Sequence, residues 1–194
     1  LVGAPDSNAV DVDAGRVYLF SGRGGPFPLA LTATAADHIF SGDSLAQMLG
    51  TSLCSLGDVD GDGKADLAIA AAQTMGIIGP GEVSVYSGAT RSPLYTVYGE
   101  NIGDWFGFDI DAVDDVNGDS VSDLIVGAPK HYAQFADCGR AYLHSGADGS
   151  LLATFTGQSA DEQFGRSVAG LGDINGDGKP EIVIGLPKSR AMYS

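Results

Sequence analysis

The sequence predicts an all-β protein made of four-stranded antiparallel blades of a β-propeller. An acidic loop of nine residues recurs three times, at offsets of 57 and 58 residues. A repeat longer than 50 residues is too long for a helical hairpin and suits a propeller blade. The 29 glycines and the short apolar runs also indicate many turns and strands rather than long helices.

The three acidic loops carry oxygen atoms at the same positions. Side chains with oxygen stand at positions 1, 3, 5 and 9, and position 7 can offer its main-chain carbonyl. Alternate side chains of an extended backbone point to one side, so several oxygens can surround one cation. The candidate metal ligands are Asp58, Asp60, Asp62, Lys64 and Asp66 in loop one, Asp115, Asn117, Asp119, Val121 and Asp123 in loop two, and Asp173, Asn175, Asp177, Lys179 and Glu181 in loop three.

The composition of the loops also predicts the ion. They contain no histidine or cysteine, so the all-oxygen donors favour calcium over magnesium or manganese and argue against zinc. We therefore expect about three calcium ions. Position 4 is always glycine, which can turn the backbone around an ion at little steric cost. Loop two is the weakest copy because Ser120 replaces the glycine found at Gly63 and Gly178.

Two other interpretations of the loops are less favoured. An EF-hand needs a glutamate at position 12 and flanking helices, whereas position 12 here is Ile69, Val126 or Ile184 within short apolar runs. Alternatively, the Asp-Gly and Asn-Gly pairs only form hairpin turns. Three aligned copies make the second interpretation weaker than it would be for one isolated loop.

The repeats overlay to give a strand order within each blade. Strand one precedes each loop and strand two follows it, while strands three and four come after a further connection. The expected strand-one segments are 50–56, 107–113 and 165–171, and the strand-three segments, each ending in Ser-Gly, are 17–22, 83–88 and 141–146. The expected repeats are 1–48 (partial, strands two to four), 49–105, 106–163 and 164–194 (partial, strands one and two).

Short motifs flank the acidic loops. Phe106-Gly107 and Phe164-Gly165 precede a loop, and Gly127-Ala128-Pro129 follows one. The chain thus resembles the FG-GAP repeat, the blade unit of the integrin alpha-subunit propeller and of many secreted bacterial proteins. This resemblance implies a β-propeller with the loop ligands named above and a role in extracellular adhesion or ligand binding. Repeat one departs from the motif, with Leu49-Gly50 and Ala70-Ala71-Ala72.

About three repeats are present, in permuted phase, because residues 1–5 align with strand two and the chain stops after strand two of the last repeat. Propellers usually close with 4 to 8 blades, and an open array would expose edge strands. Two explanations follow. The favoured one is a piece of a longer propeller, and the other is a homodimer that completes a six-bladed ring.

Charge and motifs exclude several functions. Asp plus Glu total 25 and Lys plus Arg total 10, for a formal net charge of −15, so we expect no nucleic-acid partner. The apolar runs are too short for membrane insertion. No nucleophile or zinc-protease signature occurs, so the chain is not expected to be an enzyme. The three histidines are expected to be surface or strand residues, Asp104 a turn cap, and the two cysteines free thiols.

Two functions agree with these observations. The first is a calcium-stabilised module, extracellular or at the cell surface, that binds a protein or glycan ligand through loops such as 23–47, which includes Phe27. Trp105 either contacts that ligand or caps a contact between blades. The alternative is an accessory propeller of a secreted polysaccharide lyase or lipase whose catalytic residues lie elsewhere.

Overall fold

A computed structural model describes residues 1–8, 11–22, 30–73 and 79–187. Phe27 and the last residues of the expected fourth repeat lie outside this part of the chain. The described residues form thirteen strands and one short 3-10 helix, Ala33–Ala35. The prediction of an all-β class is therefore confirmed.

The strands are grouped into four antiparallel sheets in chain order. Two sheets have four strands, one has three, and one has two. The three-stranded sheet contains β1 (Val2–Ala4), β2 (Arg16–Leu19) and β3 (His38–Ser41). The first complete sheet contains β4 (Leu49–Gly57), β5 (Asp66–Ala71), β6 (Glu82–Tyr86) and β7 (Pro93–Tyr98). The second contains β8 (Ile110–Val113), β9 (Asp123–Ala128), β10 (Arg140–His144) and β11 (Leu151–Thr156), and the last contains β12 (Ser167–Gly172) and β13 (Glu181–Gly185).

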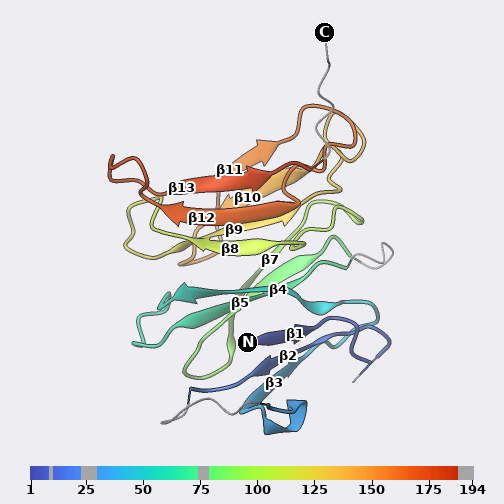
Figure 1. Ribbon diagram of the computed structural model, residues 1–194, viewed down its shortest axis with the longest axis vertical. Helices are drawn as coiled ribbons and strands as arrows, with labels where there is room; N and C mark the ends of the chain where they lie inside the picture. Colours follow the sequence, from blue (N-terminus) through green and yellow to red (C-terminus); the bar gives the residue numbers. More distant parts are fainter. Residues whose placement is uncertain (9–10, 23–29, 74–78, 188–194) are drawn as a thin grey trace.

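Each complete sheet is a meander in which consecutive strands are hydrogen-bonded neighbours, as in a propeller blade. The sheets follow one another along the long axis of the molecule, from β1–β3 at one end to β8–β13 at the other (Figure 1). Strand β8 contacts both β4 and β12, so the first strands of successive blades lie beside one another. This arrangement places the three acidic loops at the same end of three successive blades.

The second strand of each complete blade is buried along its whole length. All six residues of β5 and all six residues of β9 are buried, because neighbouring blades cover both faces of the sheet. The apolar runs that follow the acidic loops therefore form the core, as their lack of alternation predicts. The equivalent strand β13 is only partly buried, since no further sheet covers it among the described residues.

The glycines of the two family motifs meet where adjacent blades touch. A Cβ atom on Gly127 would lie 2.0 Å from the carbonyl oxygen of Gly165, and one on Gly3 would lie 2.2 Å from that of Gly50. Such distances exclude any side chain, so glycine lets the two backbones approach. In the middle contact, Ala70 replaces the first glycine, and the ideal Cβ position of Gly107 lies 3.2 Å from the Ala70 Cβ. The degenerate motif of repeat one therefore retains this contact with a looser fit.

Both cysteine thiols are free, as expected, with Cys54 in β4 and Cys138 before β10. Burial and the nearby carboxylates of Asp111 and Asp109 raise the pKa of Cys54 to about 12. Within the described residues, the structure contains no helix with the length and apolar character needed to cross a bilayer.

Candidate metal centre

The acidic loops connect the first two strands of three blades and share one hydrogen-bonded frame. In loop one (58–66), Oδ1 of Asp58 accepts the N–H groups of Gly61 and Asp62 at 2.8 and 3.1 Å. Its Oδ2 accepts the N–H of Gly63 at 2.8 Å. The carboxylate at position 1 thus gathers three backbone donors, which folds the loop back on itself.

The same bonds recur in the other two loops. Asp115 in loop two (115–123) accepts three N–H groups at 2.6–3.1 Å. Asp173 in loop three (173–181) does so at 2.6–3.2 Å. These donors, led by Ser120 for Asp115 and by Gly178 for Asp173, hold the pKa of both carboxyl groups below its ordinary value. Both groups are therefore ionised near neutral pH.

Position 9 links each complete loop to the rest of its blade. Asp66 is fully buried; its Oδ2 accepts the Val59 N–H at 2.8 Å and its Oδ1 accepts the Gly88 N–H at 2.8 Å. Asp123 is also fully buried and accepts the equivalent bonds from Val116 and Gly146 at 2.8 and 3.2 Å. Each carboxylate therefore ties its loop to the Ser-Gly turn after the third strand.

The pKa of Asp123 shifts in the opposite direction from the pKa of Asp115 and Asp173. Removal from water raises its pKa, while the N–H donors of Val116 and Gly146 oppose that rise. The charges of Asp119 and Asp115 raise it further. A cation between these carboxylates would favour the ionised form of all three.

Carboxylate oxygens converge in two of the loops. One oxygen each from Asp58, Asp60 and Asp66 lies within 4.8 Å of the others, and Asp173, Asp177 and Glu181 form a second such group. Among the described residues, loop two brings no three carboxylates this close. The donor sets of loops one and three fit a hard divalent cation, because every ligand is an oxygen and several are charged.

Two differences in loop two bear on its backbone and its ligands: position 6 differs from both other loops, and position 3 differs from loop one. Ser120 has a φ of 68°, in the left-handed region, where Gly63 and Gly178 have φ values of 85° and 84°. Position 3 is Asn117, whose Nδ2 donates to Asp119 Oδ2 at 2.9 Å and so engages an oxygen that a metal could use. Loop three also has asparagine at position 3, and the Nδ2 of Asn175 donates to both Asp177 and Glu181.

The remaining predicted ligands lie in the same loops. Asp62, Asp119 and Asp177 each accept the N–H of position 7 at 2.8–2.9 Å, which places Lys64, Val121 and Lys179 beside them. This bond orients position 7 at the end of the loop, just before the second strand begins.

A buried histidine is the feature that the sequence interpretation missed. His131 was expected at the surface or in a strand, but it is 2% exposed and its Nδ1 lies 2.7 Å from Asp104 Oδ2. Asp104 also caps a turn, as predicted, by accepting the Asn101 N–H at 3.2 Å. The two residues come from neighbouring blades, so only the fold reveals their pairing. Trp105 stacks on Phe108 with ring centroids 5.6 Å apart, which favours a packing role.

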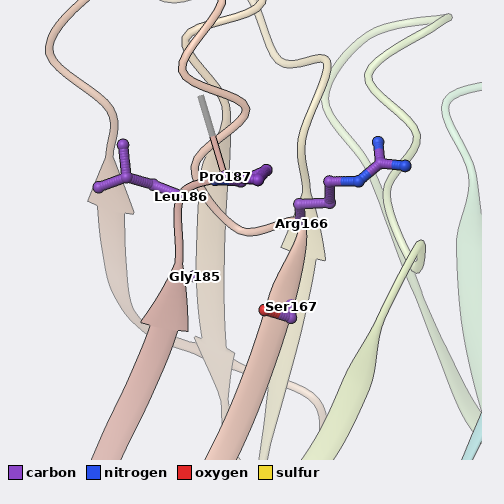
Figure 2. Close-up of a pocket in the computed structure, with 5 residues that line it drawn as sticks. All are labelled: Arg166, Ser167, Gly185, Leu186 and Pro187. Carbon is purple, nitrogen blue, oxygen red and sulfur yellow. The ribbon is translucent and has the colours of Figure 1, made fainter. Parts of the chain in front are cut away.

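A hollow of about 380 Å³ lies at the open ends of β12 and β13 and is lined by Arg166, Ser167, Gly185, Leu186 and Pro187. Arg166 and Leu186 extend from its two sides in different directions (Figure 2). The Arg166 guanidinium carbon lies 5.0 Å from the centre of the Phe108 ring, and its Nη1 donates to Gln163 at 3.2 Å. The cationic side chain of Arg166 is therefore already in contact with Phe108 and Gln163.

Comparison with known proteins gives one consistent result. The family model of the FG-GAP repeat matches residues 49–86, 106–144 and 164–188. Integrin alpha-V of Gallus gallus is 32% identical over 147 residues, which cover 69% of this chain and 13% of that protein. Integrin alpha-PS2 of Drosophila melanogaster is 31% identical over 142 residues, covering 68% and 10%. Integrin alpha-IIb of Mus musculus is 39% identical over 105 residues, covering 49% and 10%. The chain thus spans a small part of the length of these relatives.

Proposed function

Because the chain belongs to the family of FG-GAP repeat proteins, we propose that it is a calcium-binding β-propeller module of an extracellular or cell-surface binding protein. One observation carries the proposal. The same acidic loop, with the same hydrogen-bonded frame, occurs at the same place in three successive blades. A purely local turn has no need of four carboxylate or amide side chains aimed into one loop.

The metal in this proposal has a structural role. The ligands are the fifteen loop residues named from the sequence, and loops one and three have the closest carboxylate groups. Bound calcium would neutralise part of the crowded negative charge in each loop. Its binding free energy would add to the stability of the folded chain, because the unfolded loop holds no such arrangement.

The ligand of the module is a protein or glycan, in keeping with the similarity to integrin alpha subunits. The proposal assigns no catalysis to the chain. The environment of His131, the most buried histidine of the chain, supports a role without catalysis, since this residue is enclosed between two blades and hydrogen-bonded to Asp104. A residue in that position stabilises a contact and is closed to substrate.

Calcium removal tests the proposal. We expect the melting temperature in excess chelator to fall by several degrees relative to saturating calcium. One site at 100 times its Kd contributes ~2.7 kcal/mol, and 1 kcal/mol shifts the melting temperature of a domain of this size by ~2–4 °C. The measurement is thermal unfolding followed by circular dichroism, with calcium added back to the same sample.

Magnesium at the same concentration is the control for general charge screening, and it should restore less stability than calcium. Identical melting curves with calcium and with excess chelator would refute the structural role of the metal.

A further inference from the structure

The two contacts between successive blades at the start of the chain are filled differently. Junction one is the contact between sheet β1–β3 and sheet β4–β7, and junction two is the contact between β4–β7 and β8–β11. Both junctions contain a cluster of buried apolar side chains. The cluster of junction two includes the aromatic side chains of Phe106 and Tyr142, whereas junction one contains a groove of about 340 Å³ beside the contact between Phe40 and Tyr86.

One cause of the groove is side-chain size. In junction two, Tyr142 packs against Phe106 with ring centroids 5.2 Å apart and lies 6.3 Å from the ring of His131. The strand-three segments 83–88 and 141–146 align at an offset of 58 residues, which places Ser84 at the position of Tyr142. A hydroxymethyl group cannot fill the volume of a phenol, so a space remains beside Ser84.

The other cause is charge. In junction two, Arg140 Nη1 donates to both carboxylate oxygens of Glu100, at 2.9 and 3.0 Å, and this pair spans the junction. The equivalent positions in junction one are Glu82 and Asp43, which are both acidic. Two carboxylates repel each other instead of pairing. The residues of junction one at the positions that close junction two therefore leave junction one open.

The lining of the groove suits a ligand rich in hydroxyl groups. It combines the hydroxyl groups of serine, threonine and tyrosine with carboxylates and amides, and none of its described lining residues is Lys, Arg or His. Ser84 and Thr96 share a hydrogen bond of 2.8 Å, and Gln47 donates to Glu82 at 2.6 Å, so these groups are held in place. Anions are disfavoured by the two carboxylates.

A further feature favours a sugar. Tyr98 is 62% exposed where β7 ends, and its ring offers a flat face with negative potential to the polarised C–H groups of a pyranose.

We propose that the groove of junction one, between Asp43, Gln47, Glu82, Ser84 and Tyr98, is a binding site for a neutral saccharide. The carboxylates and amides accept and donate hydrogen bonds to sugar hydroxyl groups, and the tyrosine ring covers an apolar face of the sugar. The volume is at the lower end of the ~300–1,000 Å³ of small-molecule sites, which suits one or two sugar units. This inference rests on the proposed binding function and specifies its ligand class and location.

The test uses the whole chain with saturating calcium and three probes: the methyl glycosides of glucose, galactose and mannose. Saturation-transfer-difference NMR should show saturable binding of at least one glycoside. Ser84→Tyr, which copies the residue of junction two, and Glu82→Arg, which copies Arg140 and can pair with Asp43, should each weaken that binding at least about tenfold. Thr154→Tyr is the matched control, since it adds a phenol at an exposed position of junction two and should leave binding unchanged.

Melting curves of every variant establish that it is folded, and Glu82→Arg provides a second result if Ser84→Tyr fails to fold. No saturable binding of any glycoside, or equal binding by wild type and both groove variants, would overturn the proposal. Binding of putrescine without binding of a glycoside would also overturn it, because the acidic groove would then be a cation site. The calcium shift of the melting temperature is measured on the same samples, so failure of the groove is distinguished from failure of the calcium proposal.

Discussion

Loops one and two follow the same backbone path with different side chains at four of their nine positions. Both have aspartate at position 1 with three N–H donors and a fully buried aspartate at position 9. The differences that bear on the cation and on the backbone are at position 3, with Asp60 against Asn117, and at position 6, with Gly63 against Ser120; positions 7 and 8 also differ. The frame of the loop thus depends on positions 1 and 9. The charge offered to a cation varies at position 3, and the backbone strain varies at position 6.

The largest effect is expected at position 9, where the two loops should behave alike. Asp66→Ala and Asp123→Ala each remove a buried acceptor of backbone N–H groups, including one in the Ser-Gly turn. We expect each substitution to lower the free energy of unfolding by ~2–4 kcal/mol, because the abandoned donors remain buried. Urea unfolding in excess chelator measures this loss without a contribution from metal.

Asp148→Ala is the control, since Asp148 is an exposed turn acid that accepts one local N–H bond. It should change the urea midpoint little. A large loss for only one of the two position-9 variants would show that the loops do not share a common frame.

A smaller effect is expected at position 3, where the loops should differ. Asn117→Asp adds a carboxylate to loop two and removes the amide donor that engages Asp119. Calcium affinity rises with the number of charged ligands, so we expect the affinity of loop two to increase about tenfold, equivalent to ~1.4 kcal/mol. Isothermal titration calorimetry measures the change.

The reverse substitution, Asp60→Asn in loop one, should weaken one site by a similar factor and leave the fold intact. Unchanged calcium titrations for both variants would contradict the assignment of position 3 as a ligand.

The loops and the strand order could be predicted because both depend on local spacing. Oxygen at alternate positions and the apolar run after each loop are visible in a single repeat. The partner of Asp66 was not predictable in this way, because Gly88 lies 22 residues further along and approaches only when the third strand pairs. The same reason hid the contact between Asp104 and His131, which belong to different blades.

The groove of junction one was also beyond the reach of sequence spacing alone. The groove exists because Ser84 is too small to fill the space that Tyr142 fills in junction two, and because Glu82 cannot form the ion pair that Arg140 forms there. These causes are evident only from a comparison of the two junctions. The segment 23–47 was expected to meet a ligand, and four of the groove residues, Ser41, Asp43, Ser44 and Gln47, belong to it.

The smallest effect is expected at position 6, where loop two has a strained backbone. Ser120→Gly removes a Cβ atom from a residue with a φ of 68°, which relieves ~1–2 kcal/mol of left-handed strain. The added freedom of glycine in the unfolded chain offsets ~0.5–1 kcal/mol of that gain. The net increase in the free energy of unfolding should therefore be ~0.5–1 kcal/mol, and Gly63→Ser should cause a similar loss in loop one. Ser120→Ala keeps the Cβ atom and should give no gain in the urea midpoint, so an equal gain from alanine would show that backbone strain does not distinguish the two loops.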